Sequence, residues 1–273
     1  MSQTVSQSVS QNMSQEISQY KIEAGTGQHI GDRTEQQDRI ALFNAPRAPG
    51  YMMAVLADGM GGASGGRIAA EQAIGTAQQV FKNFSPLTDE VEPMLHQIVD
   101  EIHTVISLMT LASEMRPQTT VALLVLTPEK NAIWAHAGDS RIYRFAGPNL
   151  VERTTDHAGE APMSGAMSSR VLHNVVGDVR ITPALTIGRH AGLQPGDAFL
   201  LCSDGLWQYI EDIEFGPAIA MNSPRDAAQM LIRKARERAT DGDADNCTLG
   251  IVKLVALPKE IRNYEVGKMR RAV

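Results

Sequence analysis

The chain has 273 residues, a formal net charge of −6 and an apolar fraction of 43%, values typical of a globular protein with a sizeable core. The acidic balance argues against DNA as the main partner, no apolar run approaches the roughly 18 residues that cross a bilayer, and neither a secretory signal nor a CxxC zinc motif is recognisable. We expect a cytoplasmic, monomeric protein that binds neither nucleic acid nor a membrane.

Three segments differ in composition. Residues 1–18 repeat Ser-Gln and are polar, so they cannot bury enough surface to fold alone, and we predict a disordered tail. Residues 19–256 are predicted to form one folded domain. Residues 257–273 contain several Lys and Arg, and we predict a solvated basic tail, with a docking site for an acidic partner as the alternative.

Short apolar or β-branched runs, bounded by Gly, Pro, Asp and Asn, predict strands. These runs cover residues 39–44, 51–57, 119–126, 131–137, 141–145, 198–203 and 247–254. Apolar residues at helical spacing predict three helices, over 64–83 with Ser64 as its cap, over 88–112 and over 224–239.

The order of these elements predicts the fold class. The connections over 127–130, 138–140 and 146–149 are too short for a parallel crossover, so the strands that they join should be antiparallel neighbours. Antiparallel strand sets with helices inserted in pairs indicate an α+β fold. We predict an antiparallel β-sandwich flanked by helix pairs, in α-β-β-α layers.

Four aspartates lie beside apolar strands: Asp58, Asp139 and Asp204 each follow one, and Asp245 precedes the last. A single such aspartate is usually a turn former, but four in one domain predict a cluster whose repulsion a divalent cation would neutralise. Oxygen ligands favour Mg²⁺ or Mn²⁺ over zinc. Gly59 could offer its carbonyl as a further ligand or belong to a flexible loop.

Arg33 and Asp38 lie just before the first predicted strand. A guanidinium can hold two phosphate oxygens in its planar fork, and Asp38 could orient Arg33 or a metal-bound water. An Arg and an Asp around a turn also commonly form a surface ion pair, so two interpretations stay open.

Seven short motifs follow one another in the chain. They are Arg33-x-x-x-Gln37-Asp38, Asp58-Gly59-Met60-Gly61-Gly62, Thr119-Thr120, Gly138-Asp139-Ser140-Arg141, Thr155-Asp156-His157, Ser203-Asp204-Gly205-Leu206-Trp207 and Asp245-Asn246. Each motif alone is weak, but their order and spacing over residues 22–256 are specific. Together they resemble the metal-dependent type 2C serine/threonine protein phosphatases, most of all the bacterial branch.

The resemblance implies a catalytic domain that hydrolyses phosphoserine and phosphothreonine in proteins through a hydroxide that bridges two Mn²⁺ or Mg²⁺ ions. Arg33 would grip the substrate phosphate, and Asp38 would act through water. The substrates would be proteins phosphorylated by a serine/threonine kinase. The implied ligand set is Asp58, the carbonyl of Gly59, Asp204 and Asp245, with Asp139 helping Asp204 to hold a third, weaker ion.

The chain departs from the family pattern at three places. Gln36-Gln37 stands before Asp38 where relatives usually have Asn followed by Glu or Gln. Met60 stands where many relatives have His, which leaves the acid for the leaving group open: His29, His136 and His157 are candidates, although structural histidines are commoner, and a metal-bound water is another. Residues 158–170 are rich in Gly, Ala and Ser without a helical pattern, where bacterial relatives carry a longer, partly helical flap. We expect a shortened flap and a wider entrance.

Two other functions were weighed against the phosphatase. A catalytically weak phosphoprotein-binding module of the same fold would suit the unusual Gln36-Gln37 pair and the short flap, but degenerate relatives usually lose a metal ligand, and Asp58, Asp204 and Asp245 are all present. A two-metal nuclease is disfavoured by the acidic balance.

Overall fold

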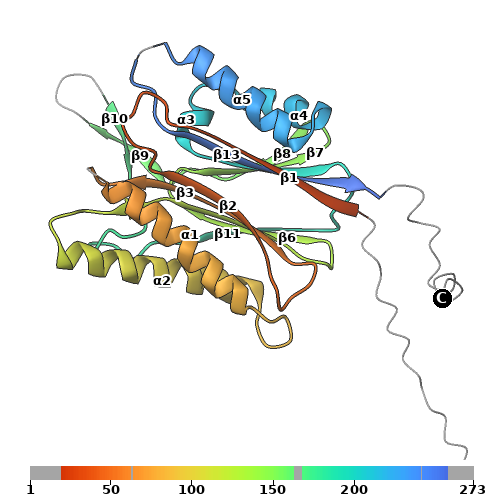
Figure 1. Ribbon diagram of the computed structural model, residues 1–273, viewed down its shortest axis with the longest axis horizontal. Helices are drawn as coiled ribbons and strands as arrows, with labels where there is room; N and C mark the ends of the chain where they lie inside the picture. The colour runs from red at the N-terminus through yellow and green to blue at the C-terminus, as the bar shows by residue number, and fades with distance from the viewer. Residues whose placement is uncertain (1–19, 63, 163–167, 241, 258–273) are drawn as a thin grey trace, which may run out of the picture.

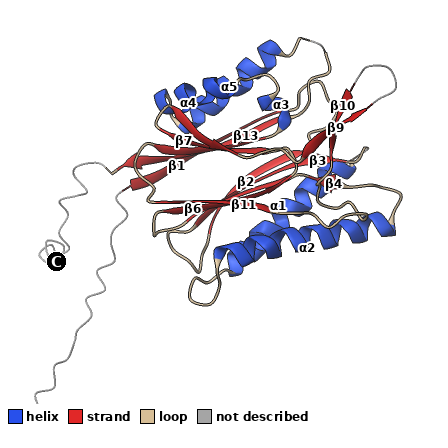
Figure 2. Ribbon diagram, turned by 180° about the vertical axis from the view of Figure 1, so that it is seen from behind, coloured by secondary structure: helices blue, strands red, loops and turns tan. Residues whose placement is uncertain are grey.

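The computed structural model describes residues 20–62, 64–162, 168–240 and 242–257 (Figure 1). The tail predicted over 1–18 and nearly all of the basic stretch over 257–273 lie outside these residues. The described chain forms four layers, with two antiparallel sheets face to face and helices on both outer sides (Figures 1 and 2). The predicted α+β sandwich flanked by helix pairs is confirmed.

The larger sheet has the strand order β11-β6-β5-β3-β2, with the short β4 paired to β3, and α1 and α2 cover its outer face. Alternate residues of β3 are buried on both sides, with Val55 against the helices and Leu56 against the other sheet, which explains why this strand is a continuous apolar run. The elements are β2 (Asp38–Asn44), β3 (Met52–Met60), α1 (Gly65–Asn83), α2 (Val91–Ala112), β4 (Gln118–Thr119), β5 (Val121–Leu126), β6 (Asn131–Ala137) and β11 (Thr186–Ala191).

The smaller sheet has the order β1-β13-β12-β7-β8, and α3, α4 and α5 cover its outer face. The edge strand β1 pairs with β13 so that Tyr20 lies opposite Ala256, and the two ends of the described domain lie side by side. The elements are β1 (Tyr20–His29), β7 (Arg141–Ala146), β8 (Asn149–Arg153), β12 (Asp197–Cys202), α3 (Asp204–Trp207), α4 (Asp212–Met221), α5 (Pro224–Arg238) and β13 (Cys247–Ala256).

The connection over 138–140 contradicts the prediction that it joins antiparallel neighbours. β6 belongs to the larger sheet and β7 to the smaller one, so the turn crosses between the layers. Gly138 has φ 109°, a conformation that favours glycine, and this lets the chain turn sharply at the edge of the sandwich. The connections over 127–130 and 146–149 do join antiparallel partners, as predicted.

The helix ends differ from the prediction in two places. Ser64 precedes α1 but has φ 53° and its side chain makes no capping bond, and α2 begins at Val91 rather than at 88. Ser223 does cap α5, because its hydroxyl accepts a hydrogen bond from the amide of Asp226. None of the helices in the described residues is long and apolar enough to span a bilayer.

The segment predicted to be a short flap contains a β-hairpin. β9 (Ala158–Pro162) pairs with β10 (Ser168–Leu172), and residues 163–167 between them lie outside the described chain. The described part of 158–170 is thus extended rather than helical, in keeping with its composition. The hairpin stands at one end of the sandwich (Figures 1 and 2).

Candidate active site

An open cavity of about 420 Å³ lies at the edge of the sandwich, where the ends of β2 and β3, the turn after β6, the start of α3 and the turn before β13 meet. Arg33 and all the predicted metal ligands line it, and Leu172 at the end of the β9–β10 hairpin also borders it. We call it the carboxylate cavity. The ligands that the sequence indicated, and which are brought together here, are Asp58, Gly59, Asp139, Asp204 and Asp245.

Asp38 is buried behind the cavity and pairs with Asp58, which lines it. The β2–β3 register places them opposite each other, and Asp38 is only 2% exposed. The hydroxyl of Ser203 donates to Oδ2 of Asp38 at 2.7 Å, and the two carboxyl groups also share a hydrogen bond. Burial, with smaller help from neighbouring carboxylates, raises the pKa of Asp38 to about 7 and that of Asp58 well above its usual value.

Asp204 is the first residue of the short helix α3, directly after β12. Its burial, followed by the charges of Asp139 and Asp245, raises its pKa to about 8. Three carboxyl groups of this site therefore hold protons more tightly than they would in water. Such an arrangement favours a divalent cation, because a cation would replace the protons and remove the repulsion.

The donor set fits a hard cation. The predicted ligands are carboxylate oxygens and one carbonyl oxygen, the ligands that Mg²⁺ and Mn²⁺ prefer. Among the residues described, no group of three His, Cys, Asp or Glu side chains is already arranged to hold an ion. Asp245 instead faces Arg33, so a cation bound here would compete with this arginine for the carboxylate.

The guanidinium of Arg33 forms a bidentate ion pair with the carboxylate of Asp245. Nε donates to Oδ1 at 3.1 Å and Nη2 donates to Oδ2 at 2.8 Å, and the two side chains are 47% and 40% exposed. The sequence left open an ion pair between Arg33 and the nearby Asp38. The structure excludes that pair, because Asp38 is buried against Ser203 and the partner of Arg33 lies 212 residues further along the chain.

Asn246 fastens the loop that carries Arg33. Its Nδ2 donates to the carbonyls of Ile30 and Glu35 at 2.8 and 3.1 Å, and its Oδ1 accepts from the amide of Gln37 at 2.6 Å. The sequence analysis noted Asn246 within a motif but gave it no role. An amide side chain that both donates and accepts is the group suited to such a buried three-way junction, and its place beside Asp245 was the only signal.

Motif residues outside the cavity hold the turn that presents Asp139. Trp207 in α3 donates from Nε1 to the carbonyl of Asp139 at 3.0 Å. The guanidinium of Arg141 lies 3.7 Å from the centre of the Trp207 ring and makes two hydrogen bonds to Asp156. These contacts fix the turn that carries the Asp139 carboxylate.

Gly59 permits a close approach of two elements. A Cβ at this position would collide with the carbonyl of Gly66 at the start of α1. The absence of a side chain thus allows the helix to lie directly against β3, beside the predicted carbonyl ligand. The flexible-loop interpretation is wrong for Gly59, which lies within β3 and pairs with Thr119.

The three histidine candidates for the leaving-group acid do not line the carboxylate cavity. The rings of His136 and His157 stack at 4.4 Å, and burial lowers the pKa of both, that of His157 to about 4. Nδ1 of His29 accepts a hydrogen bond from the amide of Gly31. Each makes contacts that stabilise the fold, as the commoner interpretation expected.

Residues 25–240 match the family described as protein phosphatase 2C. The chain belongs to this family. It is 30% identical over 247 residues to protein phosphatase PhpP of Streptococcus pneumoniae, an alignment that covers 81% of the chain and 93% of that protein. The comparison confirms the family that the motifs indicated, in its bacterial branch, and the enzyme class, a phosphoprotein phosphatase.

Solved structures share the fold. The S. agalactiae serine/threonine phosphatase aligns with a TM-score of 0.73 at 24% identity, over 85% of this chain and 99% of that one. The catalytic domain of the phosphatase PstP, crystallised with two manganese ions, aligns with a TM-score of 0.69 at 21% identity, over 86% and 98%. The sandwich seen here is therefore the fold of the family.

Proposed function

We propose that this chain hydrolyses phosphoserine and phosphothreonine in proteins, with two divalent cations and a hydroxide that bridges them as the nucleophile. The observation that supports this most is the meeting, in one open cavity, of carboxylates from separate strand ends with a single arginine. The two manganese ions in the PstP structure favour Mn²⁺ or Mg²⁺ as the cofactor.

Asp58, the carbonyl of Gly59, Asp204 and Asp245 would hold the two cations, and Asp139 would contribute to a third, weaker one. Bound cations would supply what the side chains lack, since they acidify water and neutralise charge on the phosphoryl oxygens. The carboxyl groups would lose their protons on loading, because the cation takes over the role of the proton in reducing repulsion.

Arg33 would bind the substrate phosphate. Its guanidinium is half-exposed at the cavity, and its two-pronged contact with Asp245 demonstrates that both prongs can face one anion. When Asp245 turns to a cation, the fork becomes free for two phosphate oxygens, whose spacing is similar to that of a carboxylate.

Asp38 would act from behind the cations. It is held by Ser203 and lies opposite Asp58, which lines the cavity. In the loaded site it would fix the orientation of Asp58 and of water in the cavity, and it would not contact the phosphate.

The test is hydrolysis of p-nitrophenyl phosphate and of a phosphothreonine peptide with Mn²⁺, Mg²⁺ or EDTA, for the parent, Asp204→Asn and Asp100→Asn. Asp100 is an exposed aspartate on α2 and serves as the matched control. We expect metal-dependent turnover that Asp204→Asn lowers by about 10²-fold or more and that Asp100→Asn leaves intact. A folded parent without turnover on either substrate would replace the enzyme with the catalytically weak phosphoprotein-binding module.

The remaining partners follow from the chemistry. A phosphoserine in a protein must be made by a serine/threonine kinase, so the substrates would be products of such a kinase. The monomeric state and the cytoplasmic location stay predictions from the sequence.

A further inference from the structure

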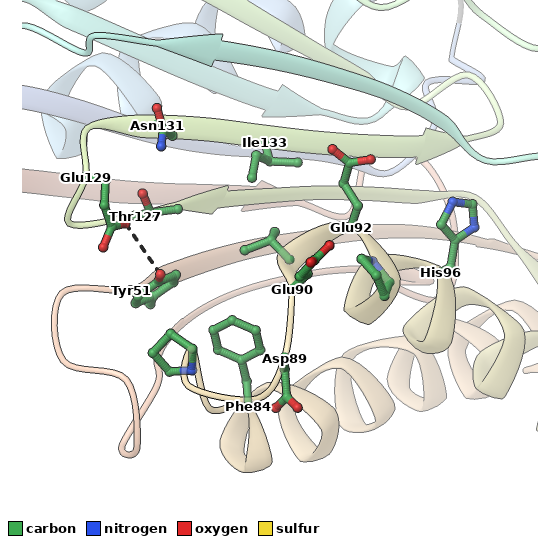
Figure 3. A pocket seen from close by; sticks show the side chains of 13 residues that line it. Tyr51, Phe84, Asp89, Glu90, Glu92, His96, Thr127, Glu129, Asn131 and Ile133 are labelled. Atoms are coloured by element: carbon green, nitrogen blue, oxygen red, sulfur yellow. Dashed lines mark hydrogen bonds between the residues drawn. The ribbon is translucent and has the colours of Figure 1, made fainter.

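A second depression of about 520 Å³ lies far from the carboxylate cavity (Figure 3). It is formed by the α1–α2 connection, the start of α2 and the turn between β5 and β6. Tyr51 provides an aromatic wall, backed by the buried Phe84, with ring centres 5.3 Å apart. β3 runs from beside Tyr51 to the carboxylate cavity at Asp58, so its length separates the two sites by roughly 20–25 Å.

Three carboxylates at this depression have no cationic partner among the residues that the structure describes: Asp89, Glu90 and Glu129. Figure 3 shows Glu129 beside Tyr51, whose hydroxyl donates to it at 3.4 Å. Glu92 differs, because Arg189 already binds it. We call this surface, made of Tyr51, Phe84, Asp89, Glu90 and Glu129, the acidic groove.

The chain has a segment of opposite charge that leaves the domain at the same end. Residues 257–273 contain five Lys or Arg and two Glu, as well as Ile261, Tyr264 and Met269. The segment follows Ala256, which lies opposite Tyr20. Glu129 lies close enough to Tyr20 for its charge to raise the pKa of the tyrosine, after the larger effect of burial.

The other tail does not match the groove. Residues 1–19 have one charged side chain, Glu16, which has the same sign as the groove. The basic segment is long enough to reach the groove, because its 17 residues span up to about 55 Å when extended. Tethering also places it near the groove at an effective concentration in the millimolar range, so weak individual contacts suffice.

We propose that the basic segment, residues 257–273, binds in the acidic groove of its own chain. Its Lys and Arg side chains lie against Asp89, Glu90 and Glu129, and an apolar side chain packs on the wall of Tyr51 and Phe84. The carboxylate cavity stays open, since the groove lies at the other end of β3. The bound segment covers a surface that would otherwise attract basic stretches of other proteins.

The experiment measures paramagnetic relaxation enhancement of backbone amide signals in the full-length chain. Met269→Cys receives a nitroxide label, which the buried thiols of Cys202 and Cys247 do not take up. The amides of Val91 and Lys130 report on the groove, and Mg²⁺ is used because Mn²⁺ is itself paramagnetic. We expect both amide signals to be lost and to return when the nitroxide is reduced. We also expect them to return in 1 M NaCl, which screens surface charges.

Two sets of variants decide whether the groove is responsible. Glu90→Gln with Glu129→Gln keeps the size of both side chains and should restore the amide signals. Asp100→Asn with Glu237→Gln removes the same charge from exposed positions outside the groove and should not. Broadening that persists in the groove variant, or that falls elsewhere on the domain, would overturn the proposal, as would no broadening at all.

The position of the spin label distinguishes the basic segment from other occupants of the acidic groove. A label at Ser14→Cys that broadens the groove amides, while the Met269 label does not, would make the N-terminal segment the occupant. If the groove amides broaden only when an isotope-labelled chain is mixed with a separate, spin-labelled chain, the occupant is a second copy of the protein. Either result contradicts binding in cis. Phosphatase activity on p-nitrophenyl phosphate should stay unchanged in the groove variant, so this test is independent of the proposed function.

Discussion

Arg33 and Asp245 are 212 residues apart in the chain and form a two-pronged ion pair at the mouth of the carboxylate cavity. One partner is the residue proposed to bind phosphate and the other is a proposed cation ligand. The guanidinium contacts both oxygens of this carboxylate, so a cation bound to the same oxygens would compete with it. Cation binding and release of Arg33 are thus expected to be linked.

Arg33→Ala tests this link. The substitution frees Asp245, so we expect tighter Mn²⁺ binding to the metal-free protein in calorimetry. It also removes the phosphate fork, so we expect kcat/KM for a phosphothreonine peptide to fall by about 10²-fold. Arg33→Lys is the control, because it keeps the charge without the fork and should recover only part of the activity. Unchanged affinity for Mn²⁺ would show that the pair does not compete with the cation.

The buried carboxyl groups predict an unusual pH dependence of stability in the metal-free protein. Asp204 and Asp38 have folded-state pKa values of about 8 and about 7, raised mainly by burial. Between about pH 7 and 8 the folded state therefore binds more protons than the unfolded state, and the free energy of unfolding should fall as the pH rises. His157 acts in the opposite direction, but only below the ordinary histidine pKa of about 6.5.

Urea unfolding in EDTA at pH 7.0, 7.5 and 8.0 measures this slope. Mg²⁺ should raise stability most at the highest pH, where no protons need to be displaced. Asp204→Asn should flatten the slope, whereas Asp100→Asn should leave it as in the parent. Stability that rises with pH over this range in EDTA would contradict the raised pKa values.

The sequence predicted best those elements whose signal is local. β3, β5 and β12 are buried on both faces and are therefore continuous apolar runs. β1 was missed because it contains glycines and lies at a sheet edge with exposed residues. α4 was missed because Gly216 and Pro217 are poor helix formers, and Gly216 is needed where the carbonyl of Pro148 approaches.

The candidate site, like the fold, was predicted only where the sequence signal is local. The aspartates were found because each lies beside a strand, and the strand order then brings them together. The partner of Arg33 and the role of Asn246 depend on contacts over more than 200 residues, for which the sequence holds no local signal. The turn at Asp139 was assigned to one sheet because a short connection between strands does not reveal a change of layer.

Asn246→Ala should weaken the loop that carries Arg33. The substitution leaves the carbonyls of Ile30 and Glu35 and the amide of Gln37 without their partner, and we expect a loss of about 1–3 kcal/mol in urea unfolding. Hydrogen exchange of residues 30–37 should accelerate. Asn149→Ala, at an exposed position at the start of β8, should cost less than about 0.5 kcal/mol. Exchange rates in the loop equal to those of the parent would refute the role given to Asn246.

Two glycine-to-alanine substitutions, at Gly59 against α1 and at Gly75 within it, are expected to change the stability in opposite directions. Gly59→Ala places a methyl group against the carbonyl of Gly66, so α1 must move away from β3, and we expect a loss of about 3 kcal/mol or more together with weaker cation binding. Gly75 lies within α1 on the exposed side, and a Cβ there meets no atom within 4 Å. Gly75→Ala should stabilise the protein by about 0.5–1 kcal/mol through helix propensity. Urea unfolding with and without Mg²⁺ measures the stability of both variants. Unchanged stability of Gly59→Ala would contradict the close packing of α1 on β3.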